Sequence, residues 1–144
     1  MDYKTAKQLY DSKRIALIES IQKYGESHNR EYRATLNYFF VDTSNYLNAL
    51  NKSVDGIKDT ENENNVIVDA YKRGIGMMDN LQKEISDQGT GVGAESVDDI
   101  DTHIRERLSI ISDDLKSCAS LICSNSRNVH SQDIAADRRS CLSR

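Results

Sequence analysis

The sequence predicts an all-α protein: a helical bundle of three to four long amphipathic helices with coiled-coil-like packing and a mobile C-terminal tail. Apolar residues recur at three- and four-residue steps over long stretches, which is the spacing of one helix face. The chain has no proline and no tryptophan, so nothing compels a helix break and few large aromatics anchor a compact globule. Its 144 residues are the size of one domain.

The first helix is expected over about residues 3–24. Its stripe repeats every seven residues and is widened by apolar neighbours. Gly25 follows the stripe and predicts the helix end, because glycine is common just past a helix C-terminus. The stripe residues are Tyr3, Ala6, Leu9, Tyr10, Leu17, Ile18, Ile21 and Tyr24.

The second helix is expected over about residues 29–58 and has the strongest seven-residue repeat in the chain. At roughly 1.5 Å per residue it would be some 45 Å long, a length that suits a bundle or a coiled coil. Its heptad line is Leu36, Thr43, Leu50 and Ile57, with Tyr32, Phe39 and Tyr46 beside it.

A third helix is expected to begin near Thr60, which forms a capping-box pattern with Glu63. Its stripe is interrupted by Gly74 and Gly76, each of which costs a helix interior about 1 kcal/mol relative to alanine. Two interpretations stay open for these glycines: a kink or a close helix crossing, or simply a weakened helix.

Residues 87–95 hold a Gly-rich linker that separates a three-helix region, residues 1–86, from a long amphipathic helix over residues 96–123. Ser96 and Asp99 form a capping-box-like pair at its start. The stripe of this fourth helix needs cover, either from its own chain or from another copy. It comprises Val97, Ile100, Ile104, Leu108, Ile111, Leu115, Cys118 or Ala119, and Ile122.

Residues 124–144 form a Ser/Arg-rich tail with scattered apolar residues, and we expect it to be flexible. Four arginines in it are candidates for binding nucleic acid or another anionic surface. The alternative is an inert, solvated chain end. The four are Arg127, Arg138, Arg139 and Arg144.

No pattern in the sequence specifies a catalytic residue, a cofactor site or a metal site. The segment 89–94 matches a Gly-x-Gly-x-x-Ala fingerprint, but the residues before it predict a helix and not the strand that a dinucleotide site requires. Cys118 and Cys123 lie five residues apart, about 140° around a helix, and cannot clasp one metal ion together. The acidic group at residues 95–101 lacks the spacing of a calcium loop. We therefore expect no enzyme.

Charge and cysteine content limit the binding partners and the cellular compartments that the sequence favours. A net charge of −4 disfavours a nucleic-acid binder that uses its whole surface. Three cysteines are an odd number without metal-ligand spacing, which favours reduced thiols and a cytoplasmic or other reducing compartment. The charged N-terminus does not resemble a signal peptide, and we expect no membrane insertion.

The function expected from these patterns is that of a structural, adaptor or chaperone-like subunit that binds a protein partner or, preferably, another copy of itself. We expect the apolar stripes to leave surface that one small monomer cannot close. The alternative is a regulatory binder of nucleic acid or an anionic surface through the tail. The interface candidates are Leu36, Phe39, Leu50, Ile100, Ile104, Leu108, Ile111 and Leu115.

Overall fold

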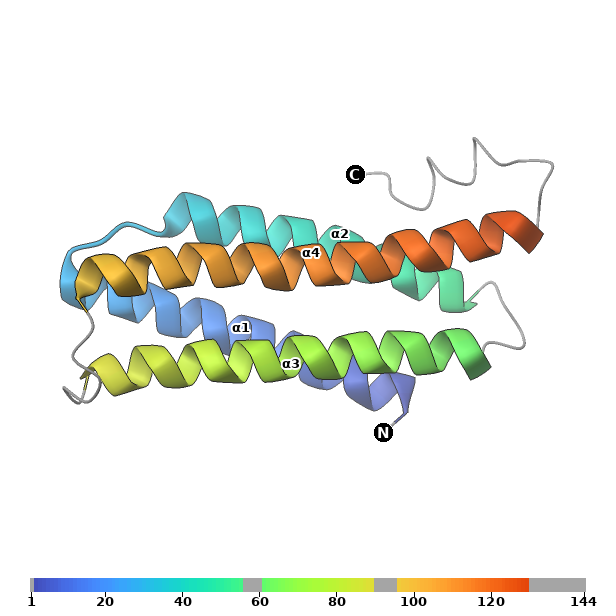
Figure 1. Ribbon diagram of the computed structural model, residues 1–144, viewed down its shortest axis with the longest axis horizontal. Coiled ribbons are helices and arrows are strands. Elements are labelled where there is room, and N and C mark those ends of the chain that lie inside the picture. The colour runs from blue at the N-terminus through green and yellow to red at the C-terminus, as the bar shows by residue number, and fades with distance from the viewer. Residues whose placement is uncertain (1, 56–60, 90–95, 130–144) are drawn as a thin grey trace.

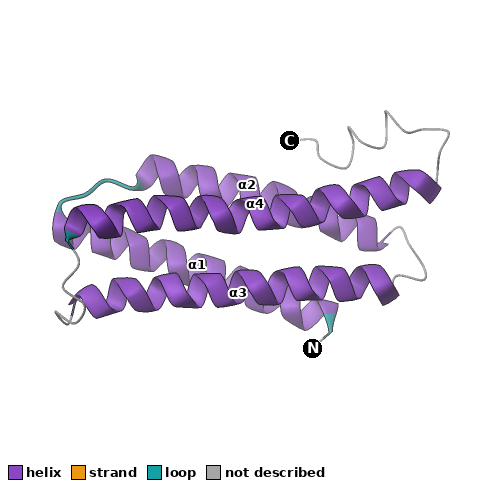
Figure 2. Ribbon diagram, in the orientation of Figure 1, coloured by secondary structure: helices purple, strands orange, loops and turns teal. Residues whose placement is uncertain are grey.

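A computed structural model of the chain describes residues 2–55, 61–89 and 96–129, and within them the side chains of residues 2–53, 66–87 and 96–122. This part of the chain contains helices and no strand: α1 (Tyr3–His28), α2 (Arg33–Asp55), α3 (Glu61–Gly89) and α4 (Val97–Val129). Figures 1 and 2 show the four long helices lying alongside one another. The predicted all-α bundle is confirmed.

The helices form a ring in which α1 lies beside α3, α3 beside α4, and α4 beside α2, while α1 and α2 touch at few points. Two side-chain contacts give the directions: Lys13 pairs with Asp79, and Ser20 accepts a hydrogen bond from Gln82, so α1 and α3 run parallel. In Figure 1, α2 and α4 also run in the same direction, whereas α3 runs against α4. The bundle is therefore closed most loosely between α1 and α2.

The core is made of the predicted stripes. Most described stripe residues of the four helices are buried, and among the largest fully enclosed side chains are Tyr10, Leu50, Ile67 and Ile104. The stripe of α4 is covered by α2 and α3 of its own chain, so helix four docks in cis here. Burial of this much apolar surface is the main stabilising contribution of such a bundle.

The predicted end of the first helix at Gly25 is wrong, because α1 continues to His28. The left-handed residue that ends it is Asn29, with φ of 56°, and the Asn29 and Arg30 amides both donate to the Gly25 carbonyl. Gly25 has another role: a Cβ there would lie 2.6 Å from the Arg30 carbonyl oxygen and 2.9 Å from the Tyr32 ring. It lets the connection to α2 cross the helix closely.

Helix boundaries also differ from expectation elsewhere. Residues 29–32 form the connection and α2 begins at Arg33, where the Glu31 carboxylate accepts from the Arg33 amide over 2.8 Å. At the other end of the chain, α4 continues past residue 124 to Val129, since no glycine or proline stops it. Residues 90–95 of the expected linker and residues 130–144 of the expected tail lie outside the described residues.

The structure tests two further expectations, the capping patterns at the helix starts and the effect of the glycines within α3. The Ser96 hydroxyl accepts from the Asp99 amide over 3.0 Å, as its capping pattern predicts, whereas Thr60 lies outside the described residues. Helix α3 runs through both glycines. At Gly74 a Cβ would lie 2.4 Å from Tyr10 Cε2, which identifies a close helix crossing, while Gly76 has nothing within 4 Å and only weakens the helix.

Candidate functional site

The eight interface candidates taken from the apolar stripes all lie in the core of one chain. None of them is more than 4% exposed. The four stripes close on one another, so the apolar surface that we expected them to leave open is absent from the described part of the molecule. Of these eight, Phe39 and Leu108 line a groove that is open to a partner, and the other six are enclosed. The eight are Leu36, Phe39, Leu50, Ile100, Ile104, Leu108, Ile111 and Leu115.

The side chains of the four arginine candidates in the tail lie outside the described part of the structure. Arg127 lies in α4 but its side chain is not described, and Arg138, Arg139 and Arg144 lie outside the described residues. Their role stays a prediction.

The outward side of α2 has an unusual composition for an exposed helix. Between Ala34 and Asn51, Asp42 is the one charged residue. Tyr38 is 72% exposed and Val41 is 48% exposed, the first being the most exposed large apolar side chain that the structure describes. We call this surface the α2 outer face. It comprises Ala34, Asn37, Tyr38, Val41, Asn45 and Asn48, all exposed except Asn45, which is half-buried.

Surfaces of the other helices are charged in the usual way. Exposed positions include Lys4, Glu19 and Lys23 on α1, and the outward side of α3 carries Lys72 and Lys83. Large apolar residues exposed on α3 and α4 are Val66, Ile110 and Leu121. Ion pairs such as the one between Arg73 and Asp114 also join α3 to α4, whereas the residues of the α2 outer face are uncharged and form no ion pair.

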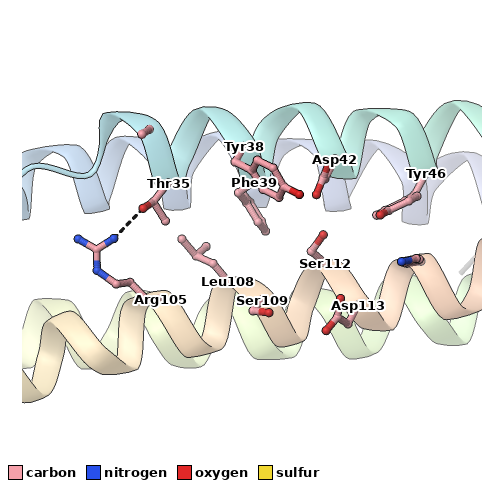
Figure 3. Close-up of a pocket in the computed structure, with 12 residues that line it drawn as sticks. Thr35, Tyr38, Phe39, Asp42, Tyr46, Arg105, Leu108, Ser109, Ser112 and Asp113 are labelled. Carbon is pink, nitrogen blue, oxygen red and sulfur yellow. Dashed lines mark hydrogen bonds between the residues drawn. The ribbon is translucent and has the colours of Figure 1, made fainter. Parts of the chain in front are cut away.

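An open groove of about 580 Å³ adjoins the α2 outer face on its α4 side. Figure 3 shows residues of α2 along one wall and residues of α4 along the other. Apolar side chains of Phe39 and Leu108 contribute to the lining, together with hydroxyl and charged groups. The remaining lining residues are Ala34, Thr35, Tyr38, Asp42, Tyr46, Arg105, Ser109, Ser112, Asp113 and Lys116.

Arg105 fixes one end of this groove. Its guanidinium donates to the Thr35 hydroxyl over 2.7 Å, pairs with Asp101 over 3.0 Å and lies 5.1 Å from the centre of the Tyr32 ring. A cation held by a carboxylate and an aromatic face in this way is positioned and largely neutralised. A ligand in the groove would therefore meet hydroxyl groups and apolar side chains, and no strong net charge.

On its other side, α2 is joined to α1 through Arg14, whose side chain is almost fully buried. One guanidinium nitrogen donates to the hydroxyls of Thr43 and Ser44 over 2.8 and 2.9 Å, and the other pairs with Asp11 over 2.9 Å. The guanidinium also lies 4.6 Å from the centre of the Phe40 ring. Sequence reasoning missed this bridge, although an arginine at a stripe position and Thr43 on the heptad line were available signals.

Beside the bridge, Ile15 of α1 and Phe40 of α2 remain 48% and 42% exposed. They add apolar surface to the α1 side of the α2 outer face. The face is thus bordered by an amphipathic groove on one side and by two exposed apolar side chains on the other.

Titratable groups in the structure serve packing and pairing. Burial raises the pKa of Glu84, but hydrogen bonds from Arg107 and His103 outweigh it and hold the pKa below its usual value. Burial raises the pKa of Cys118 to about 11. Within the described residues, no three histidine, cysteine, aspartate or glutamate side chains are grouped to hold a metal ion, and no helix is long and apolar enough to span a bilayer.

Comparison with family models, with curated proteins and with solved structures finds no match to this chain. The α2 outer face therefore has to be interpreted from its own chemistry.

Proposed function

We propose that this chain is a non-enzymatic interaction protein, acting as a structural, adaptor or chaperone-like subunit, and that it binds its partner through the α2 outer face. The observation that supports the proposal most is the exposed, uncharged and aromatic surface of α2, on which Tyr38 is 72% exposed. The centres of protein interfaces are depleted in charged residues and enriched in tyrosine, because charges are costly to desolvate there.

Tyr38 is the natural anchor of such an interface. A tyrosine contributes a large apolar ring and a hydroxyl that can hydrogen-bond at the edge of the contact. The neighbouring groove along Phe39 and Leu108 can receive a side chain of the partner, with hydroxyls of Thr35 and Ser112 available for its polar groups. An anchor next to a receiving groove is the arrangement in which a few residues dominate binding energy.

The binding surface in this proposal differs from the stripes on which the sequence analysis relied. Phe39 and Leu50 face the core, and the residues between them on the opposite side of the same helix face outward. The second candidate function, anionic binding through the tail arginines, gains no support from a described side chain.

The experiment is affinity purification of the tagged chain from the cells that make it, with an untagged copy present. Tyr38→Glu places a charge on the α2 outer face, and Ile110→Glu places one on α4 at a residue that is 53% exposed. Loss of an anchor of about 2 kcal/mol lowers binding roughly thirtyfold. We expect Tyr38→Glu to lose the co-purifying protein and Ile110→Glu to retain it. Cross-linking before lysis retains weakly bound partners, so equal retention by both variants, or no bound protein with the unmodified chain, contradicts the proposal.

A further inference from the structure

Five of the six residues of the α2 outer face are arranged symmetrically along the helix, Tyr38 being the exception. Ala34, Asn37, Val41, Asn45 and Asn48 follow one another at steps of three, four, four and three residues. Such steps keep side chains on one side of a helix, and the sequence of steps reads the same in both directions about Val41. Two copies of this helix placed antiparallel would therefore oppose the same stripe, with Val41 meeting Val41 at the centre.

The chemistry of the stripe is complementary to itself. An asparagine amide has both donors and an acceptor, so it can pair with another asparagine. In the antiparallel arrangement Asn37 of one copy lies level with Asn45 of the other. No charged group lies on the stripe, so two copies can approach without like-charge repulsion there.

Charges at the ends of α2 favour the antiparallel direction. In a parallel pair, Lys52 would face Lys52 and Arg33 would face Arg33. In the antiparallel pair, Lys52 of one copy comes level with Arg30 of the other, whose charge is already paired with Asp98 and whose neighbour Glu31 is exposed. The antiparallel pair thus avoids a contact between two unpaired lysines.

Apolar side chains on the two flanks also become matched. Tyr38 leans toward α4, since it lines the groove, and Phe40 lies toward α1, since Arg14 stacks on it. A two-fold axis at Val41, perpendicular to two antiparallel helices, sets the α4 side of one copy against the α4 side of the other, and the α1 side against the α1 side. Phe40 of one copy then lies about 3 Å along the helix axis from Phe40 of the other, and Tyr38 lies about 9 Å from Tyr38 on the opposite flank.

We propose that the partner of the α2 outer face is a second copy of this chain, bound antiparallel about a two-fold axis that passes through Val41. This inference rests on the proposed function and adds the partner and the geometry. Isologous two-fold pairs of this kind are the commonest form of protein self-association.

The size of the contact predicts its strength. The stripe from Ala34 to Asn48 is about 21 Å long, and the contact is centred on one helix. It belongs to the small class of interfaces, below about 1,200 Å² in total, in which association is weak and reversible. The dimer should therefore form with rising concentration and dissociate on dilution.

The test is the molar mass of the full chain by light scattering over a concentration series, with two matched variants. Val41→Asp puts like charges on the axis. Val66→Asp makes the same change on α3, at a valine that is 39% exposed compared with 48% for Val41. We expect the unmodified chain and Val66→Asp to rise to about twice the 16.3 kDa of one chain, and Val41→Asp to stay at one chain mass.

A second variant tests whether the two-fold axis lies at Val41. Val41→Cys should form a disulfide between two chains faster than Val66→Cys does under the same mild oxidation, since only a residue on the axis meets its own copy. A single-chain mass up to ~1 mM, where even a millimolar dimer is populated, overturns the inference. So does a dimer that survives Val41→Asp, which would use another face. Loss of a co-purifying protein in Tyr38→Glu with a monomeric chain would leave the proposed function standing and this inference refuted.

Discussion

The close crossing of α1 and α3 at Gly74 makes a sharp prediction, because the chain supplies its own control two residues away. A Cβ at Gly74 would lie 2.4 Å from Cε2 of Tyr10 and 3.3 Å from two further atoms of its ring, whereas a Cβ at Gly76 would meet nothing within 4 Å. Both glycines lie inside α3, so both changes to alanine bring the same gain in helix propensity.

The magnitudes follow from these distances. Replacing a helix-interior glycine by alanine stabilises by about 0.5–1 kcal/mol when nothing obstructs the methyl group. Tyr10 is 1% exposed and its ring lies 5.3 Å from that of Tyr71, so it cannot swing away into solvent. Forcing a methyl group into such a packed site costs about 1–3 kcal/mol. Gly76→Ala should therefore be more stable than Gly74→Ala by roughly 1–3 kcal/mol.

The assay is urea unfolding followed by far-ultraviolet circular dichroism, with all proteins at one chain concentration because self-association would add to apparent stability. We expect the midpoint to rise for Gly76→Ala and to fall or stay unchanged for Gly74→Ala. Equal stabilisation of the two variants would show that α1 and α3 do not meet closely at Gly74, and would refute the parallel α1–α3 packing described here.

Three further predictions concern buried or paired groups. Arg14→Ala should destabilise the bundle by about 1–3 kcal/mol, the range expected when hydrogen bonds to a charged group are lost, and Arg14→Lys should recover only part of this loss. Urea unfolding measures the difference, and an unchanged midpoint would contradict the bridge. Because the pKa of Glu84 is lowered in the folded state, its pairing contributes stability above the unfolded value near 4.5 that is lost as pH falls through the folded pKa. Glu84→Gln should therefore lose less stability than the unmodified chain between pH 7 and pH 3, and parallel losses in thermal melts would argue against the pairing. Burial that raises the pKa of Cys118 to about 11 should keep its thiol unreactive at pH 8 until the chain unfolds; peptide mapping after alkylation measures this, and rapid labelling of the folded chain would refute it.

Periodicity predicted most of the buried apolar residues, although not the buried Arg14. The three- and four-residue steps of Ile104, Leu108 and Ile111 specify one helix face, and the structure encloses that face. The same pattern does not say which helix covers it. Adjacency of α1 and α3 depends on details such as the missing Cβ of Gly74, where sequence alone left a crossing and a weakened helix equally open.

The remaining differences have local physical reasons. Gly25 resembles a helix stop in sequence, yet its lack of a Cβ serves the crossing of Arg30, and an asparagine adopts the left-handed conformation instead. The α2 outer face was missed because attention to apolar spacing favours buried positions. The available signal was negative: between Ala34 and Asn51 one charged residue occurs where a solvated helix would carry several.

The central claim is that the α2 outer face is covered when the protein is at work, and hydroxyl-radical footprinting in the cells that make it tests this most directly. Tyr38, Ile110 and Leu121 are all more than half exposed in the free chain and should be oxidised when the isolated protein is dilute. In the cell we expect Tyr38 to be protected several-fold while Ile110 and Leu121 react as before. Oxidation of Tyr38 in the cell at the rate of the dilute chain would contradict the account.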